Sequence, residues 1–304
     1  MKITILGAGS MGSLIGSYLS KKYDVTMIDT YDKAIDHINS EGIKIVDIDN
    51  SEIVYKPKAY LSGECEEVCD LLVIFVKDTA TDKALELNKK AIGENTIVLT
   101  LQNGMGNDEI ISKYVKKENI LLGTTKHNAH TLGLCEVKHS GSGITHVGSL
   151  VGNHDMASKI VDLLNECGFE ATMSTSINHL LWEKLFVNCT INALTCILET
   201  TMDFMNYDSP LDPATSNVLK EAITVAKADG EDFDYDTIKK QLYDLTVKYV
   251  GGKASMEQDV ELKRITEIDF INGSVVRIGK KYGIPTPVNE TVVSLVHSKE
   301  KLYK

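Results

Sequence analysis

A glycine-rich turn near the N-terminus constrains the fold of this chain more than any other feature. Residues 2–6 (KITIL) predict a short strand, GAGSMG follows at 7–12, and a predicted helix comes next. The pattern G-x-G-x-x-G between a strand and a helix, in a unit of roughly 30 residues, is typical of dinucleotide binding. Gly7 permits the tight turn, Gly9 lets the backbone approach a pyrophosphate, and Gly12 lets the helix pack on the strand.

The helix that begins at this turn offers free N–H groups and a positive dipole to phosphates. We therefore predict a dinucleotide site in which the backbone is supplied by Gly7, Ala8, Gly9, Ser10, Met11 and Gly12. The alternative is a glycine turn that binds no ligand.

Asp29 ends a second predicted strand (24–29), about 20 residues after the glycines. A carboxylate at this place accepts hydrogen bonds from the adenosine ribose hydroxyls and repels a 2′-phosphate. The next residues, 30–33 (TYDK), contain no arginine, although Lys33 could rescue some phosphate binding. We therefore predict NAD(H) as cofactor in preference to NADP(H). The alternative is that Asp29 only caps the following helix.

Strands and helices alternate through the first half of the chain. The run at 71–76 (LLVIFV) is continuously apolar, as expected of a strand buried on both faces. Further strands are predicted at 96–101, 120–125 and 170–173, and helices at 32–40, 79–91, 110–114 and 157–167. This alternation predicts a parallel sheet covered by helices on both faces. Hairpins are predicted at 43–48 with 52–55, and at 136–139 with 144–147 around a Gly-Ser-Gly turn.

No strand is predicted after residue 174. Helices are predicted at 179–198, 214–228, 235–250 and 256–282. A chain of 304 residues is long enough for two domains. We therefore expect an α/β protein with a Rossmann-type parallel sheet and an antiparallel extension at 1–174, followed by an all-helical domain at 175–304.

Charge and cysteine usage limit the class of partner. The net charge is −11 and no basic stripe occurs, so nucleic acid and anionic membranes are poor candidates. The six cysteines form no C-x-x-C pair, and we expect reduced, mostly buried thiols and no metal site. No signal-like segment or long apolar run appears, so we expect neither secretion nor membrane insertion, and a cytoplasmic protein.

A polar stripe interrupts an otherwise apolar predicted helix. Lys184, Asn188 and Asn192 recur every four residues within LLWEKLFVNCTINALTCIL, residues 180–198. A stripe of one ammonium and two amides amid so much apolar surface suits a polar cavity, because an exposed face would normally carry more charge. Burial lowers the pKa of a lysine, which favours a general acid for a ketone oxygen, and amides can orient that oxygen. The alternative is the solvent-facing edge of a half-buried helix.

Seven motifs occur in one order along the chain. They are GAGSMGS (7–13), FVKDTATDKAL (75–85), LQNGMGNDEII (101–111), LGTTKHNAH (122–130), GSGITHVG (141–148), LWEKLFVNCTINALT (181–195), and SMEQD (255–259) with TEIDFING (266–273). With these motifs the chain resembles the ketopantoate reductase (2-dehydropantoate 2-reductase) family over about residues 1–298. The combination of QNG, W-x-K-x-x-x-N and TEIDFING is far more specific than the glycine turn.

The resemblance implies an oxidoreductase that reduces 2-dehydropantoate to pantoate, a step of pantothenate biosynthesis, with a nicotinamide cofactor. It implies that Lys184 is the general acid at the C2 oxygen, and that Glu267 binds the substrate or positions the lysine. It further implies cofactor or substrate contacts for Lys77, Asn103, Asn188, Asn192 and Ser255.

Each implied role has a structural alternative. Asn103-Gly104 could be only a turn, Ser255 with Gln258 fits a capping box, and Glu267 could be a helix-surface charge. In one straight helix Ser255 and Glu267 would stand about 18 Å apart along the axis. Either the helix is bent or only one of the two contacts substrate, and Glu267 is the better candidate.

The chain also departs from the family pattern. Asp29-Thr30 stand where an arginine is usual, Gly252 replaces an asparagine, a further asparagine of the family is missing near Met202, and Ala193 replaces a proline. Because these amides are missing, a second hypothesis is that the chain reduces another 2-oxo acid or is an opine-forming dehydrogenase. A catalytically silent NAD-binding protein is the third hypothesis. The oligomeric state stays open, with a homodimer as one candidate.

Overall fold

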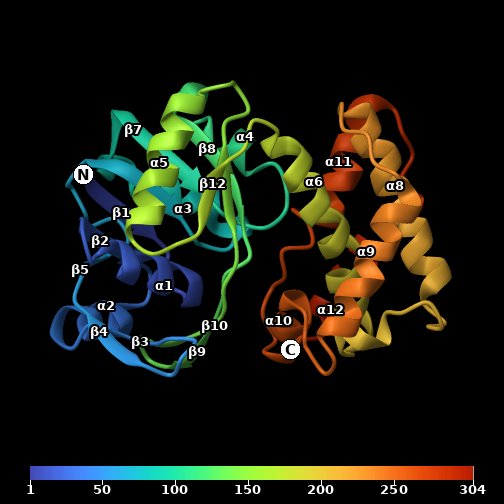
Figure 1. The fold of residues 1–304 in the computed structure, drawn as a ribbon, viewed down its shortest axis with the longest axis horizontal. Coiled ribbons are helices and arrows are strands. Elements are labelled where there is room, and N and C mark those ends of the chain that lie inside the picture. Colours follow the sequence, from blue (N-terminus) through green and yellow to red (C-terminus); the bar gives the residue numbers. More distant parts are fainter. Residues whose placement is uncertain (304) are drawn as a thin grey trace. The chain divides into compact units, whose positions relative to one another are not determined.

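The computed structural model describes residues 1–303 and divides the chain into two compact units (Figure 1). The first unit contains Met1–Gln102 and Asn107–Ile177. The second contains the short segment Asn103–Gly106 and the chain from Asn178 onward. The segment 103–106 therefore belongs to the second unit, although it follows a strand of the first.

The first unit is built on a sheet with the strand order β12-β11-β8-β7-β6-β1-β2-β5. Neighbouring strands from β8 to β5 are parallel, and β11 joins β8 in the antiparallel sense. This confirms the predicted parallel sheet with an antiparallel extension. The strands are β1 (Lys2–Leu6), β2 (Asp24–Asp29), β5 (Lys58–Leu61), β6 (Cys69–Ile74), β7 (Ile92–Thr100), β8 (Ile120–Thr125), β11 (Thr145–Gly148) and β12 (Ala171–Met173).

A second, four-stranded sheet in this unit has the order β4-β3-β10-β9. Its strands are β3 (Ile43–Val46), β4 (Glu52–Tyr55), β9 (Asn128–Gly133) and β10 (Glu136–Gly141). The antiparallel pair β3–β4 confirms the first predicted hairpin. The second predicted hairpin is wrong, because β10 pairs with β9 and β3 whereas β11 pairs with β8. Val137 and Val147 are each buried in a different sheet, so the Gly-Ser-Gly segment carries the chain between sheets.

The helices of this unit are α1 (Ser10–Leu19), α2 (Asp32–Ser40), α3 (Thr81–Leu87), α4 (Asn107–Ile111) and α5 (His154–Glu166). The predicted helix at 79–91 is shorter than expected, with 3₁₀ turns at Asp78–Ala80 and Lys89–Ala91 on either side of α3. Asn88 ends α3, since its amide nitrogen donates to the Ala84 carbonyl (2.8 Å) and to the Ser62 hydroxyl. Such side-chain bonds compete with the helical backbone pattern.

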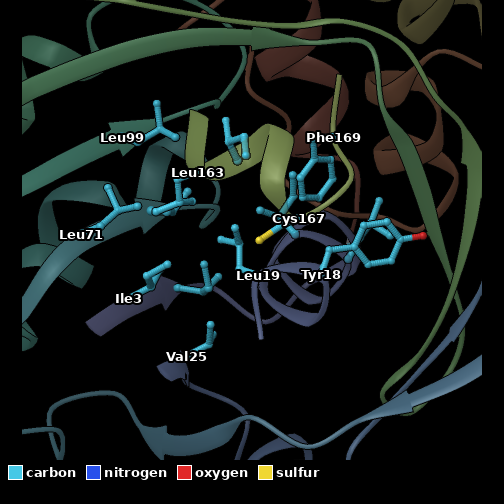
Figure 2. Packing of buried hydrophobic residues seen from close by; sticks show 14 of the residues in the cluster. Ile3, Tyr18, Leu19, Val25, Leu71, Leu99, Leu163, Cys167 and Phe169 are labelled. Atoms are coloured by element: carbon cyan, nitrogen blue, oxygen red, sulfur yellow. The ribbon is translucent and has the colours of Figure 1, made fainter. Parts of the chain in front are cut away.

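Helix α1 lies between the two sheets. It contacts β1 and β2 of the larger sheet and β3, β9 and β10 of the smaller one. Figure 2 shows side chains of α1 and of the α5 region packed with strand residues: Tyr18, Leu19, Leu163, Cys167, Phe169, Ile3, Val25, Leu71 and Leu99. The same cluster includes Ile45 and Val137 of the smaller sheet, so it packs α1 against both sheets. Full burial of each aliphatic side chain contributes roughly 1.5–3 kcal/mol to stability.

The second unit is helical, as predicted. Its helices are α6 (Ile177–Val187), α7 (Ala193–Leu198), α8 (Asp212–Ala228), α9 (Tyr235–Lys248), α10 (Ser255–Glu261), α11 (Asn272–Tyr282) and α12 (Pro287–Glu300), with a π turn at Asn188–Asn192 and a 3₁₀ turn at Met202–Phe204. Trp182 and Phe186 are fully buried in its core. No helix within residues 1–303 has the length and apolar character needed to cross a membrane.

The predicted helix at 256–282 is wrong as a single element. It is two helices, α10 and α11, separated by residues 262–271. Lys263 adopts a left-handed φ of 53°, which ends α10. Beyond it, the backbone N–H and the hydroxyl of Thr266 both donate to Glu300 (2.8 and 2.7 Å). The tertiary contact with α12, a helix absent from the predicted set, overrides the helical tendency of this segment.

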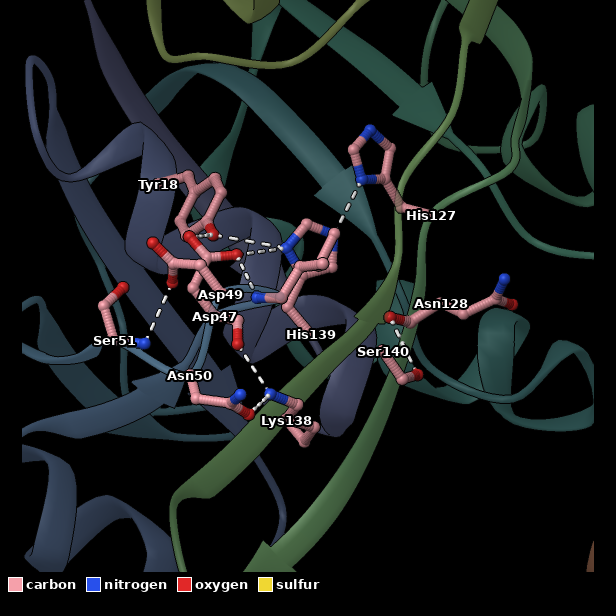
Figure 3. A network of polar contacts seen from close by, with 11 residues as sticks. Tyr18, Asp47, Asp49, Asn50, Ser51, His127, Asn128, Lys138, His139 and Ser140 are labelled. Carbon is pink, nitrogen blue, oxygen red and sulfur yellow. Dashed lines mark hydrogen bonds and ion pairs between the residues drawn. The ribbon is translucent and has the colours of Figure 1, made fainter.

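Figure 3 shows a buried polar network that joins α1 to the smaller sheet. The Tyr18 hydroxyl donates to Asp47 (2.6 Å), and His139 Nδ1 lies 2.9 Å from the same carboxylate. His139 Nε2 lies 3.0 Å from His127 Nδ1. If His139 donates from Nδ1, its Nε2 accepts the proton of His127 Nδ1. His127 Nε2 is then a bare acceptor, buried without a hydrogen-bond partner among residues 1–303.

The network favours a neutral His127 and an ionised Asp47. Burial and the adjacent His139 lower the pKa of His127, because an added proton would create a buried donor without an acceptor. Burial alone would raise the pKa of Asp47, but hydrogen bonds from Tyr18, the Ile48 amide and His139 hold it below its usual range. Lys138 adds a cation nearby, since its ammonium donates to the Asp47 carbonyl.

These shifts predict that acid loosens α1. When a pKa is lower in the folded state, the unfolded chain binds more protons, so stability is lost as pH falls through the ordinary values of 6.5 for histidine and then 3.8 for aspartate. We expect protection of the α1 amides from hydrogen–deuterium exchange, corrected for the intrinsic rate, to fall between pH 7.5 and pH 5. His127→Gln should weaken this pH dependence, whereas the exposed His130→Gln should keep it. An unchanged pH dependence in His127→Gln would contradict the assignment.

Candidate functional site

The glycine turn has the geometry that each glycine was expected to provide. Gly7 has a φ of +106°, and a Cβ there would lie 2.8 Å from the backbone of Phe75. A Cβ at Gly12 would collide with the carbonyl oxygen of Gly7, so only glycine lets α1 approach β1 this closely. A Cβ at Gly9 would have no atom within 4 Å, which leaves open space above the turn. That space is where a pyrophosphate would approach the backbone.

The N-terminus of α1 faces the same turn. Its N-cap is Gly9, which has no side chain to cap the N–H groups of Ser10, Met11 and Gly12. The first turn of a helix has N–H groups without helical partners, and these groups together with the helix dipole favour an anion. The residues therefore fit a dinucleotide phosphate.

Asp29 ties the end of β2 to the glycine turn. One carboxylate oxygen, Oδ2, accepts the Ala8 N–H (2.7 Å), and Oδ1 accepts the N–H groups of Thr30 (2.7 Å) and Tyr31 (3.0 Å). The N-cap of α2 is Tyr31, so the alternative in which Asp29 only caps this helix is wrong. A carboxylate has about four acceptor positions, so Oδ2 keeps capacity for a further donor such as a ribose hydroxyl.

Lys77 lies at the same edge of the sheet. It follows the carboxyl end of β6, which is hydrogen-bonded to β1 in parallel register. Its side chain is exposed, directly before the 3₁₀ turn Asp78–Ala80. Ligands of open parallel sheets bind outside the carboxyl ends of the strands, so this position fits the cofactor role expected for Lys77.

The second unit brings three of the expected substrate residues together. The Asn192 amide nitrogen donates to the Asn188 side-chain oxygen and to the Ser255 hydroxyl, both at 3.1 Å. Both asparagines are more than nine-tenths buried, at 6 % and 7 % exposure, so the stripe is not a solvent-facing edge. Ser255 is the first residue of α10 and does not cap it, so the capping-box alternative is also wrong.

One donor in this cluster has no acceptor in the part of the chain that the structure describes. The amide nitrogen of Asn188 is buried and has no hydrogen-bond partner among residues 1–303. Lys184, half-buried, stands four residues earlier on α6, so the two side chains lie about one helical turn apart. A buried donor without a partner is costly, and a ligand oxygen would satisfy it.

Asn103 and Glu267 form a second polar pair in this unit. The Asn103 amide nitrogen lies 3.4 Å from Glu267 Oε2, and Glu267 is 7 % exposed. Glu267 lies between α10 and α11, so it is not a helix-surface charge, and the 18 Å separation expected of a straight helix does not apply. Gly104, with a φ of +75°, packs against Phe270, and the Met105 N–H donates to the Phe270 carbonyl (2.9 Å). The QNG turn is thus anchored on the TEIDFING segment.

Two departures from the expected pattern are adjacent in the structure. The backbone N–H of Met202 donates to the carbonyl of Gly252 at 2.8 Å. The expected pattern has an asparagine at position 252 and another near position 202, so the two departures lie close together rather than scattered. The sequence separation of these residues conceals that proximity.

The chain matches two models of known protein families. Residues 3–152 match the model of ketopantoate reductase PanE/ApbA, and residues 176–300 match its C-terminal model. A 2-dehydropantoate 2-reductase from Lactococcus lactis is 35% identical over 311 residues, covering 100% of this chain and 99% of that protein.

Solved structures also resemble this chain over its full length. D-mandelate dehydrogenase in a ternary structure with NADH and anilino(oxo)acetate is 33% identical, covers 100% of this chain and 99% of its own, and has a TM-score of 0.94. A 2-dehydropantoate 2-reductase structure from Enterococcus faecalis is 31% identical, with coverage of 100% and 99% and a TM-score of 0.81.

The glycine geometry gives a matched pair of variants. We expect Gly12→Ala to destabilise the first unit by about 1–3 kcal/mol, because the added methyl group meets the Gly7 carbonyl in a packed site. Gly9→Ala should change stability by less than about 1 kcal/mol, since its Cβ meets open space. Urea unfolding followed by circular dichroism measures both. Equal effects of the two substitutions would show that the turn is not packed as described.

Proposed function

The chain belongs to the ketopantoate reductase family, and on that premise we propose that it reduces a small 2-oxo acid to the 2-hydroxy acid with NADH. The observation that carries the proposal is the buried Asn188–Asn192–Ser255 cluster, in which the Asn188 amide keeps a donor one turn from Lys184. Such a set suits an oxygen-rich ligand whose ketone gains a proton.

The first unit would hold the dinucleotide. The glycine turn and the first turn of α1 would receive the pyrophosphate, and Asp29 would accept a ribose hydroxyl through Oδ2. Lys77, at the carboxyl end of β6, would lie beside the cofactor. The bound cofactor supplies the hydride that C2 of the substrate accepts.

The second unit would hold the 2-oxo acid and supply the proton. Lys184 would donate a proton from Nζ to the C2 oxygen as that oxygen gains negative charge, which general acid catalysis requires. Asn188 would donate its unused amide hydrogen to a substrate oxygen, with Asn192 and Ser255 holding Asn188 in place. Glu267, paired with Asn103, would bind the substrate or orient the lysine.

Asp29 supports NADH over NADPH, because its carboxylate, held at the glycine turn by the Ala8 N–H, would repel a 2′-phosphate at that place. The similarity to D-mandelate dehydrogenase, whose structures contain NADH, is further support.

Ketopantoate is the first candidate substrate, on the strength of the family and of the 35% identical relative. A 2-oxo acid with a larger apolar group is the second. Met202 and Gly252, in backbone contact, remove amides that would bind a polar substrate end, and the D-mandelate dehydrogenase structure holds anilino(oxo)acetate, an aromatic 2-oxo compound.

Lys184→Ala tests the proton donor. We expect turnover to fall by roughly a factor of 10²–10⁴, the usual contribution of a positioned general acid, with the Kd for NADH unchanged. Steady-state rates and a fluorescence titration of NADH measure the two quantities. The matched control is Lys280→Ala, an exposed lysine of α11. Near-normal turnover in Lys184→Ala would remove the lysine from the mechanism.

Asp29→Asn tests the cofactor choice. We expect wild-type kcat/KM to be higher with NADH than with NADPH, and the preference to shrink by about tenfold in the variant, equivalent to about 1.4 kcal/mol of discrimination. Asp32→Asn, which removes a charge from an exposed neighbouring position, should leave the preference unchanged. A wild-type preference for NADPH would keep the family and refute the role of Asp29.

A substrate panel separates the two candidates. Initial rates would be compared for ketopantoate, a branched aliphatic 2-oxo acid and phenylglyoxylate, each with and without an amine. A higher kcat/KM for ketopantoate supports the first candidate, and a higher value for the apolar acids supports the second. Turnover that requires the amine would indicate an opine-type dehydrogenase, and NADH binding without turnover on any acid would contradict the reductase proposal.

A further inference from the structure

The helix that carries the substrate residues is not a regular α-helix. Between α6 and α7 it contains a π turn at Asn188–Asn192. The Ala193 N–H is shared between the carbonyl of Asn188, five residues back, and that of Thr190, three residues back. In an α-helix this N–H would donate to the carbonyl of Cys189, four residues back. The π turn therefore leaves the Cys189 carbonyl without that helical partner.

A side chain from another helix binds the bypassed carbonyl. The amide nitrogen of Asn272, at the start of α11, donates to the Cys189 oxygen at 2.9 Å. Both residues are fully buried. Because an unsatisfied buried carbonyl is costly, this hydrogen bond removes the main penalty of the π turn.

Asn272 is itself fixed by a chain of buried contacts. Its second amide hydrogen reaches the side-chain oxygen of Asn289 (3.0 Å), and the Asn289 amide donates to Glu221 (2.8 Å). The Glu221 carboxylate also accepts the backbone N–H groups of Val288 and Asn289. Helices α8, α11 and α12 thus hold the Asn272 amide in position.

Nothing within the turn itself prevents an α-helix. The segment 188–193 (NCTINA) contains no proline or glycine, and Ala193 has an N–H that could bond to Cys189. Isolated π turns are rare and are found mostly at functional sites. The external donor on Asn272, which binds the carbonyl that the π turn bypasses, is therefore the contact to consider as the cause of the turn.

The turn changes which side chains meet. One extra residue in a helical turn rotates everything beyond it by about 100° relative to everything before it. The π turn therefore determines how Asn192 and its partner Ser255 are oriented relative to Lys184 and Asn188, which come before it. We propose that Asn272 is a positioning residue, which maintains this π turn and thereby the arrangement of the substrate-binding side chains. The inference rests on the proposed 2-oxo acid reductase activity.

Asn272→Leu removes the donor with little change in volume. We expect kcat/KM for the best 2-oxo acid of the panel to fall by about 10–100-fold, because a misplaced substrate group costs rate steeply, while the Kd for NADH stays the same. Ser274→Ala is the control, a buried hydroxyl on the same helix that bonds only to the Ile271 carbonyl among residues 1–303. It should keep wild-type kcat/KM.

A second substitution should restore the turn. Proline at position 193 has no N–H, so it gives up the bond to Asn188 but also cannot donate to Cys189, and its ring excludes the carbonyl four residues back, which disfavours the α-helical alternative. We expect Asn272→Leu combined with Ala193→Pro to recover kcat/KM to within about threefold of wild type. A residue that acted only through stability would lower the melting temperature of both variants, leave kcat/KM of the folded enzyme unchanged and show no rescue.

Crystal structures of the variants make the test independent of activity. In Asn272→Leu the Ala193 N–H should bond to the Cys189 carbonyl, and in the double variant the chain should again contain one extra residue in the turn at 188–192, with no bond from residue 193. A π turn that persists in Asn272→Leu, or wild-type kcat/KM in that variant, would overturn the inference. If Asn272→Leu does not fold, Ala193→Pro alone decides: it should fold with near-wild-type kcat/KM, and loss of folding would overturn the inference. A wild-type enzyme inactive on every acid would refute the proposed function, while the structures would still test the turn.

Discussion

The contact between Gly12 and the carbonyl of Gly7 sets the position of α1, and the first unit depends on that position. Because no side chain intervenes, α1 lies directly on the end of β1, with its uncapped first turn beside Asp29. The same helix then separates the two sheets and contributes to one shared core. Its far end is connected through Tyr18 to the buried Asp47–His139–His127 network, so the proposed cofactor site and this network share one helix.

The second unit is organised by buried amides rather than by hydrocarbon alone. Asn188, Asn192, Asn272 and Asn289 all lie inside the helical unit, and each takes part in at least one hydrogen bond. A polar group costs free energy when buried, and it does so least where every partner is present. Two atoms of these asparagines, the Asn188 nitrogen and the Asn272 side-chain oxygen, are buried without a hydrogen-bond partner among residues 1–303. The Asn188 nitrogen stands one helical turn from Lys184, and an incomplete network beside a lysine is what the proposed substrate site requires. The same buried side chains therefore contribute to stability and to the proposed function.

Much of the fold and part of the candidate site follow from local patterns. Sequence alone predicted the glycine turn, the role of Asp29 and the buried strand β6, because each shows in a short segment or at a fixed spacing. The exposed, largely polar strand β9 gave no such signal, so β10 was assigned the wrong partner. The break between α10 and α11 was also hidden, because Thr266 is held by Glu300, more than thirty residues away.

The sequence by itself determined the strand-turn-helix unit at 2–19, the carboxylate at Asp29 and the every-fourth-residue spacing of Lys184, Asn188 and Asn192. These are properties of short segments, whose backbone preferences and side-chain periods act locally. Tertiary structure alone decided that the stripe contains a π turn, that Met202 meets Gly252 and that Asn103 meets Glu267. The last two are contacts between residues far apart in the chain, and the π turn is accompanied by a long-range bond from Asn272 to Cys189. Such bonds form only after packing has brought the segments together.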